Sequence, residues 1–256
     1  MLLAIDSGNT NTVFALFDDN GGIRGQWRLS ASPNRTADEF GVWLRQLMES
    51  SGLKTTDVKA AIIATVVPAS MFALKTLCRN YFNCEPKIVG DDDLDLGLDV
   101  KVDRPQEVGA DRLVNAVSAF ERYGGPLIVV DFGTATTFDV IAADGAYLGG
   151  VIAPGVNLSL EALHMAAAQL PRVDIRKTER ITGKDTVSAM QSGIYWGYVS
   201  MIEGLVARIR AEHGVAMDVI ATGGLAPLFT EAVECIQHAD PDLTLRGLYL
   251  VHRRNS

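Results

Sequence analysis

The chain has 256 residues, a length that fits one large or two small domains at roughly 150 residues per domain. Hydrophobic residues make up 48% of it and charged residues 21%, which is enough apolar material for a substantial buried core. The formal net charge of -8 argues against non-specific binding to nucleic acid or to an anionic membrane, because both need a basic surface. A small anionic ligand is still compatible with this charge, since backbone N–H groups and a few local cations can bind one.

The apolar segments and the cysteines narrow the class of protein further. The longest apolar stretch, residues 60–67, ends at Pro68 and is much shorter than the roughly 20 residues that span a bilayer, so we expect no membrane segment. The first residues reach a carboxylate at Asp6 without a basic leader, which is unlike a secretory signal and predicts a cytoplasmic protein. Three cysteines cannot all pair, and we expect them to be reduced. No two of the four histidines have the spacing of zinc ligands.

The chain contains an internal repeat. Residues 2–12 align with residues 127–137, at an offset of about half the chain. Each copy has four aliphatic residues followed by a polar turn, which predicts a buried strand that turns back in a tight hairpin, and glycine-containing pairs at 20–21 and 144–145 mark the next turns. We therefore expect each half to open with a β-meander. The aligned pairs are Asp6 with Asp131, Gly8 with Gly133, and Thr12 with Thr137.

Helices and a further strand are predicted after the first meander. Thr36 and Glu39 form a capping box, and the apolar positions that follow predict an amphipathic helix that stops near Gly52. Residues 61–67 form a β-branched run typical of a buried parallel strand, and a helix is predicted from Ser70 toward residue 82. Residues 109–120 predict another amphipathic helix.

The second half repeats this order of strands followed by helices. We expect a helix over residues 158–169, a long helix over 186–212, a short strand over 218–221 and a last strand over 248–251. The pattern is typical of an α/β protein with two similar lobes and a ligand-binding cleft between them. We expect an N-terminal lobe over 1–113 and a C-terminal lobe over 114–256, with the last strand or tail able to return to the N-terminal lobe.

The two aligned turns have a chemical use. Glycines let the backbone approach a ligand closely, Ser, Thr and Asn side chains add donors, and an Asp at the end of each strand can hold a cation or its water shell. One such turn alone is usually an ordinary hairpin, but two in register at half-chain spacing favour the cradling of nucleotide phosphates. Residues 183–186 read Gly-Lys-Asp-Thr without the upstream glycine of a P-loop, and the Rossmann glycine pattern is also missing.

These residues carry a family resemblance. Residues 6–10, 131–137 and 222–224 resemble the two phosphate motifs and the adenosine motif of the actin-like, sugar-kinase and chaperone ATPase superfamily. Residues 107–112 (Glu-Val-Gly-Ala-Asp-Arg) and 149–155 (Gly-Gly-Val-Ile-Ala-Pro-Gly) resemble signatures of type III pantothenate kinases. The resemblance covers nearly the whole chain, and the chain is much shorter than actin, hexokinase or the chaperones. It implies a duplicated actin-like fold, with a mixed sheet flanked by helices in each lobe and the active site in the cleft.

The resemblance assigns roles in binding ATP. It implies that Asp6 organises Mg²⁺ through water at the phosphates, and that Asp131 binds the monovalent cation, K⁺ or NH₄⁺, which this family uses. The residues implied in binding ATP and its phosphates are Asp6, Ser7, Gly8, Asn9, Thr10, Asn11, Thr12, Val13, Gly133, Thr134, Gly223 and Gly224.

The resemblance also assigns the substrate site. It implies that Asp111 is the base for the substrate hydroxyl, and that Gly109, Ala110, Asp111 and Arg112 contact pantothenate. Thr186 matches a threonine that the partner subunit supplies, which implies a homodimer with shared active sites. From the residues alone, Asp111 complements a helix dipole and Thr186 begins a helix. Family members often carry a tyrosine before the Gly-Ala-Asp-Arg motif, but residues 99–105 contain none, and Val102 is an apolar substitute.

The leading hypothesis is ATP-dependent phosphorylation of pantothenate to 4′-phosphopantothenate, the first step toward coenzyme A. The alternative is a regulatory relative that binds nucleotide but transfers no phosphoryl group. The carboxylates at positions 6, 111 and 131 are all present and favour the enzyme. A kinase or hydrolase for another small molecule is opposed by the Gly-Ala-Asp-Arg motif.

Overall fold

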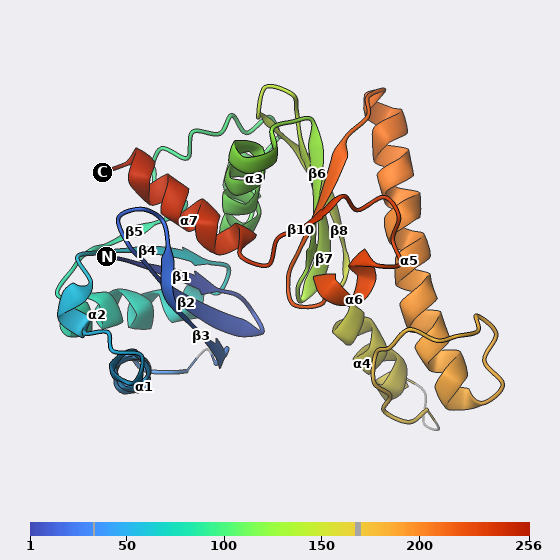
Figure 1. Ribbon diagram of the computed structural model, residues 1–256, viewed down its shortest axis with the longest axis horizontal. Coiled ribbons are helices and arrows are strands. Elements are labelled where there is room, and N and C mark those ends of the chain that lie inside the picture. Colours follow the sequence, from blue (N-terminus) through green and yellow to red (C-terminus); the bar gives the residue numbers. More distant parts are fainter. Residues whose placement is uncertain (33, 167–169) are drawn as a thin grey trace. The chain divides into compact units, whose positions relative to one another are not determined.

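The computed structural model describes residues 1–32, 34–166 and 170–256, and its chain divides into two compact units (Figure 1). Unit 1 comprises Met1–Arg122 and Asp242–Ser256, and unit 2 comprises Tyr123–Pro241. A division after residue 113 would cut helix α3 (Ala110–Tyr123), whose apolar face packs within unit 1. The division falls after residue 122 instead, and the C-terminal residues belong to unit 1.

Unit 1 contains a five-stranded mixed sheet in the order β3-β2-β1-β4-β5. The central strand β1 runs antiparallel to β2 and parallel to β4. It is buried on both faces, which explains its continuous run of aliphatic residues. The strands are β1 (Leu2–Ser7), β2 (Asn11–Phe17), β3 (Ile23–Ser30), β4 (Ala60–Thr65) and β5 (Pro86–Ile88).

Helices cover both faces of this sheet. α1 (Ala37–Ser50) and α2 (Met71–Phe82) lie on one face, and α3 and α7 (Leu243–Arg254) lie on the other (Figure 1). Successive residues of a strand point to opposite faces. Leu3 and Ile5 join the core with α1 and α2, whereas Leu2 and Ala4 join the core with α3 and α7. By this alternation Asp6 belongs to the α3 face. Three short 3₁₀ helices complete the unit: η1 (Thr55–Asp57), η2 (Pro68–Ser70) and η3 (Pro105–Glu107).

Unit 2 contains a second five-stranded sheet, in the order β10-β9-β6-β7-β8. Its central strand β6 runs antiparallel to β7 and parallel to β9, as β1 does to β2 and β4. The predicted α/β fold with two similar lobes, each a mixed sheet flanked by helices, is therefore confirmed. The strands are β6 (Leu127–Phe132), β7 (Ala135–Ile141), β8 (Tyr147–Pro154), β9 (Asp218–Thr222) and β10 (His238–Ala239).

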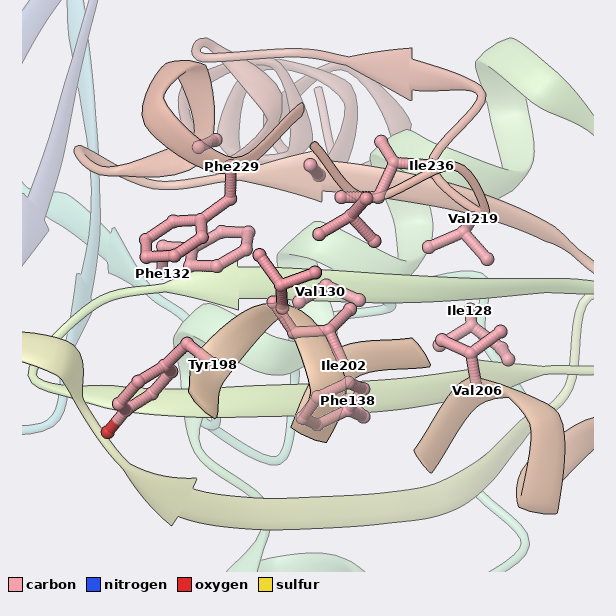
Figure 2. Close-up of a cluster of buried hydrophobic side chains, with 14 of the residues drawn as sticks. Ile128, Val130, Phe132, Phe138, Tyr198, Ile202, Val206, Val219, Phe229 and Ile236 are labelled. Carbon is pink, nitrogen blue, oxygen red and sulfur yellow. The ribbon is translucent and has the colours of Figure 1, made fainter. Parts of the chain in front are cut away.

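The core of unit 2 lies against the long helix α5 (Thr186–His213), with α4 (Val156–Ala166) and α6 (Ala226–Thr230) beside it. Ile128, Val130 and Phe132 of β6 pack in this core (Figure 2). Figure 2 shows the ring of Phe132 lying face to face with that of Phe229, at a centroid distance of 5.2 Å. Because the even positions of β6 enter this core, Asp131 belongs to the opposite face of the sheet.

Most of the predicted elements are confirmed. Both meanders form, the Thr36 capping box begins α1, and α5 ends at Gly214 in the left-handed conformation. The strand expected over residues 248–251 is wrong: this segment lies inside α7, whose Leu245, Leu248 and Val251 form one buried face. The helix expected over 158–169 begins earlier, at position 156, and positions 167–169 lie outside the described residues. In the described parts of the chain, no helix is both long enough and apolar enough to cross a membrane.

The two copies of the repeat differ by one residue at the turn. Ser7 pairs with Thr12 across the first hairpin, and Phe132 pairs with Thr136 across the second. The second loop is thus one residue shorter, and the structural counterpart of Thr12 is Thr136 and not Thr137. The sequence alignment is correct up to the turn and shifts by one residue after it.

Candidate active site

The first phosphate motif forms the turn between β1 and β2. The Gly8 N–H donates to the Asn11 carbonyl oxygen at 2.9 Å, which closes the turn. Beneath it, the Ser7 and Thr12 hydroxyl oxygens are buried and lie 3.2 Å apart in a hydrogen bond. Asn9 and Thr10 are exposed at the tip. The turn therefore has a fixed base and presents polar groups to solvent.

The structure brings this turn to the same sheet edge as the start of α3. Val66, just after β4, donates its N–H to the Ser7 carbonyl oxygen at 3.2 Å, so β1 and β4 end together. Gly109 packs on Val66: a Cβ added at Gly109 would lie 3.5 Å from Val66 Cγ1. Ligands of α/β proteins bind outside the carboxyl ends of parallel strands. Unit 1 therefore places the first phosphate turn and the Gly-Ala-Asp-Arg motif at one ligand-binding edge.

Asp111 lies in the first turn of α3 and is held close to the backbone. Its Oδ1 accepts a hydrogen bond from the Arg112 N–H at 2.8 Å, and a Cβ added at Gly109 would lie only 2.6 Å from this oxygen. Burial raises the pKa of Asp111, and the Arg112 N–H and positive charge offset part of that increase. A carboxylate with a raised pKa accepts a proton more readily near neutral pH, which suits a general base.

The neighbours of Asp111 complete the motif. Ala110 and Arg112 are half-buried in the same helical turn, where free N–H groups and the helix dipole favour an anion. Val102 is half-buried in the loop that precedes the motif. The start of α3 thus combines a proton acceptor with groups that can bind a carboxylate.

The second phosphate motif forms the turn between β6 and β7. The Gly133 N–H donates to the Ala135 carbonyl oxygen at 3.0 Å, and the Gly155 N–H donates to the Thr134 carbonyl oxygen at 3.1 Å. A Cβ added at Gly155 would lie 2.2 Å from the Thr134 oxygen, so only glycine allows the end of β8 to approach the turn. Gly133 and Thr134 remain exposed.

The third motif meets the end of β6. Gly223 follows β9 with a φ of +90°, and a Cβ added there would lie 2.5 Å from Asp131 Oδ1 and 2.7 Å from the Phe132 carbonyl oxygen. The Asp131 carboxylate and the backbone nitrogen and carbonyl oxygen of Phe132 thus pack closely on Gly223, and Gly224 is exposed beside it. Hard cations prefer oxygen ligands of these two kinds.

Thr186 is the first residue of α5 and is exposed. Asp185 caps the helix by accepting from the Ser188 N–H at 2.9 Å, and this hydrogen bond lowers the pKa of Asp185. Thr186 therefore has a fixed backbone and an accessible hydroxyl.

Tyr198 is a supporting residue that the sequence analysis missed. Its hydroxyl donates to the Pro154 carbonyl oxygen at 2.8 Å, and its oxygen lies 2.6 Å from Ser159 Oγ. In Figure 2 its ring borders the core. The spacing of Tyr198, Ile202 and Val206 indicates a buried helix face. That spacing gives no sign that the hydroxyl fixes the corner containing Gly155.

The donor set fits a metal ion that is bound largely through phosphates. Over residues 1–32, 34–166 and 170–256, no group of three or more His, Cys, Asp or Glu residues could hold a metal ion. Mg²⁺ keeps several waters and is commonly bound by one or two carboxylates together with substrate phosphates. Asp6, half-buried at the end of β1 beside the first turn, is suited to that mode of binding.

Comparison with known proteins agrees with the arrangement of these motifs. Residues 2–208 match the family model described as type III pantothenate kinase. A type III pantothenate kinase of Paramagnetospirillum magneticum is 66% identical, covering 100% of this chain and 98% of the relative. That of Rhodospirillum rubrum is 64% identical, covering 100% and 99%.

A solved structure supports the fold at lower identity. The activator of the 2-hydroxyisocaproyl-CoA dehydratase from Clostridium difficile, solved with bound ADPNP, has a TM-score of 0.55 and 10% identity. The match covers 99% of this chain and 95% of that one. The family model and the two relatives extend over most or all of the sequence. The chain belongs to the type III pantothenate kinase family.

Proposed function

We propose that this chain transfers the γ-phosphoryl group of ATP to the hydroxyl of pantothenate, which gives 4′-phosphopantothenate and ADP on the way to coenzyme A. The observation that carries the proposal is the placement of Asp111. Its carboxyl group, with a pKa raised by burial, lies at the same sheet edge as the first phosphate turn. The names of the relatives supply the substrate.

Asp111 is the base in this reaction. The substrate hydroxyl oxygen forms a bond to the γ-phosphorus while the bond from that phosphorus to the bridging oxygen of ADP breaks. The hydroxyl proton passes to the Asp111 carboxylate. Gly109 leaves room for that carboxylate, and Ala110 and Arg112 contribute to binding the anionic substrate. Phosphoryl transfer depends mainly on such positioning and on charge neutralisation.

The two glycine turns bind the phosphates. A kinase of this fold uses ATP with a divalent metal ion, which neutralises phosphate charge when bound. Asp6 holds the hydration shell of that ion, and the backbone and side chains of residues 7–13 bind phosphate oxygens. In unit 2, Gly133 and Thr134 bind phosphate, and Gly223 and Gly224 bind the nucleoside. The ADPNP bound to the Clostridium difficile protein supports nucleotide binding on this fold.

Asp131 binds a monovalent cation. The support is the convergence of Asp131 Oδ1 and the Phe132 carbonyl oxygen on Gly223. The expected result is low activity in Na⁺ buffers and higher activity on addition of K⁺ or NH₄⁺. Asp131→Asn should weaken that response, whereas equal rates in all three salts would remove the cation from this proposal.

The test of the activity is release of ADP from ATP, measured with pantothenate as acceptor. The matched control is the pantothenate analogue that lacks the reacting hydroxyl, because it binds in the same way but offers no nucleophile. We expect ATP to yield ADP when pantothenate is the acceptor and not when the analogue replaces it. If the protein binds ATP but releases no ADP in Na⁺, in K⁺ or in NH₄⁺ buffer, the regulatory alternative is favoured.

Thr186 completes the pantothenate site of a second subunit in this proposal. Mixing Asp111→Asn subunits with Thr186→Val subunits tests it, because a mixed dimer has one site with both changes and one with neither. Partial recovery of activity is expected. A monomer in sedimentation, or a mixture no more active than its parents after proven subunit exchange, would contradict the shared site.

A further inference from the structure

The segment before Thr186 is fastened to α5 by polar side chains. Residues 174–183, here called the strap, run alongside the first turns of α5. The buried side chain of Gln191, 5% exposed, uses both ends of its amide for the strap. Its Oε1 accepts from Arg176 Nε at 3.0 Å, and its Nε2 donates to the Asp174 carbonyl oxygen at 3.2 Å. One side chain thus fixes two strap residues.

A second set of bonds fixes the middle of the strap. Trp196 Nε1 donates to Thr178 Oγ1 at 3.0 Å, and Thr178 Oγ1 donates in turn to the Arg180 carbonyl oxygen at 2.9 Å. Ser192 Oγ donates to the Ile181 carbonyl oxygen. Gln191, Ser192 and Trp196 lie on adjacent positions of one helix face, so α5 presents a row of polar contacts to the strap.

The end of the strap packs directly on the helix. A Cβ added at Gly183 would lie 2.3 Å from the Ala189 nitrogen, so the backbone is in close contact with the first turn of α5. The Lys184 N–H donates to Ser188 Oγ at 3.2 Å. Only positions 184 and 185 separate this contact from Thr186. The place of Thr186 is therefore set by the helix after it and by the strap before it.

Apolar burial contributes little to the order of the strap. Most of its side chains are exposed, whereas Ile175 is half-buried and packs against the core of unit 2. A segment with few buried apolar contacts opens easily unless hydrogen bonds fix it. The buried side chains of Gln191 and Ser192 and the half-buried Trp196 all bond to this one segment, which points to a requirement for its position.

We infer that Gln191 and Trp196 are positioning residues for pantothenate, which pin the strap to α5 and thereby fix Thr186 for its contact with the substrate. This inference rests on the role of Thr186 in the proposed function. It adds the residues that act through Thr186 without touching substrate. Loosening the strap lets Thr186 sample other positions, so pantothenate binding weakens while ATP binding does not.

The test uses substitutions that remove hydrogen bonds with little change of shape. Thr178→Val removes the hydroxyl that joins Trp196 to Arg180. Gln191→Met removes both hydrogen bonds made by the side-chain amide. For each, the KM for pantothenate should rise about three- to tenfold, as expected for losing a net hydrogen bond, while the KM for ATP stays unchanged. Hydrogen exchange of residues 174–185 should become faster. Thr178→Ser keeps the hydroxyl and should restore the wild-type KM.

Tyr195→Phe is the matched control. Tyr195 neighbours Trp196 on α5, but its hydroxyl bonds to the Leu228 carbonyl oxygen at 3.2 Å and not to the strap. It should change neither KM. Faster hydrogen exchange of the strap in Thr178→Val with an unchanged KM for pantothenate would overturn the inference. Hydrogen exchange as slow as in the wild type in both Thr178→Val and Gln191→Met would also overturn it.

Failure of the inference can be told apart from failure of the proposed function. If the wild-type protein releases no ADP with pantothenate, the proposed function is wrong. If it does, but Thr186→Val leaves the KM for pantothenate unchanged, the role of Thr186 is wrong. If Thr186→Val raises that KM and neither strap variant does, only the positioning inference is wrong.

Discussion

The two hairpin turns of the repeat share their strand pairing but differ in how each is supported. In the β1–β2 hairpin, the buried Thr12 hydroxyl bonds to Ser7 at 3.2 Å. In the β6–β7 hairpin, Phe132 replaces that serine and stacks in the core, and the fully buried Thr136 hydroxyl has no hydrogen-bond partner among the described residues. The second turn has therefore gained core packing at the cost of a polar contact.

The aligned glycines are alike, since a Cβ added at Gly133 would lie 3.4 Å from the Ala135 carbonyl oxygen, and the difference lies in the glycines that pack beside the second turn. A Cβ added at Gly8 would meet only the Asn11 carbonyl oxygen, at an ordinary distance of 3.5 Å. In unit 2, Gly155 and Gly223 let backbone segments approach Thr134 and Asp131 within distances that no side chain allows. Both turns have exposed tips, but neighbouring backbone packs closely against the second turn and not against the first. The duplicated turns thus keep the same position in their sheets but have different backbone neighbours.

The largest expected effect is at Asp111, which lies outside the two aligned turns. Asp111→Asn should lower kcat by about 10² or more, the usual range for losing a general base. The melting temperature should stay the same or rise, because the variant removes a buried carboxylate whose raised pKa shows that its charge is disfavoured. Steady-state kinetics and thermal unfolding check both effects. Near-normal kcat in the folded variant would remove Asp111 from the role of base.

The close backbone packing at the second turn predicts a stability difference between glycines. Gly155→Ala should destabilise the protein by about 2 kcal/mol, because overpacking costs about 1–3 kcal/mol and the obstructing atom belongs to the backbone. Gly8→Ala is the matched control, and its change in unfolding free energy should stay within about 1 kcal/mol. Denaturant unfolding of both variants measures the difference. Equal losses at the two positions would contradict the difference in backbone packing between the two turns.

The paired threonines predict effects of opposite sign. Thr136→Val should stabilise the protein by about 1 kcal/mol, because an unsatisfied buried hydroxyl costs about 1–3 kcal/mol. Thr12→Val should destabilise it by about 1 kcal/mol, because it leaves Ser7 without its partner. The shift in melting temperature gives the sign in each case. Destabilisation of both variants would contradict the unsatisfied state of the Thr136 hydroxyl.

The smallest effect is a pH dependence that belongs to unit 1. Because burial raises the pKa of Asp111, kcat/KM for pantothenate should fall as the pH is lowered, and this fall should begin at a higher pH than for an ordinary aspartate. Folding favours the protonated form of the Asp111 carboxyl, because its pKa is higher in the folded than in the unfolded state. The resulting contribution to stability is present at low pH and is lost as the pH rises through the raised pKa. The melting temperature of Asp111→Asn relative to wild type should therefore increase with pH over that window. A constant difference would contradict the raised pKa.

Much of the local structure around the candidate site could be predicted from residue patterns, whereas the roles of its residues came from the family resemblance. The repeat located both turns, and the Gly-Ala-Asp-Arg motif located Asp111 at a helix start, since strand, turn and capping signals are local. The packing at Gly155, the hydroxyl contacts of Tyr198 and the strap on α5 could not be read in this way. They join residues far apart in the chain, and a single sequence gives no signal for such pairs.

The sequence by itself determined the elements whose pattern is long or whose ends carry a capping signal, such as β1, β6, α1 and α5. Only the tertiary structure decided the short or ambiguous ones. Residues 248–251 are a brief apolar run that suits a strand or a helix, and they are helical because Leu245, Leu248 and Val251 bury one face against the sheet of unit 1. The one-residue shift between Thr12 and Thr136 was likewise decided by strand pairing, because register depends on which face of each strand is buried.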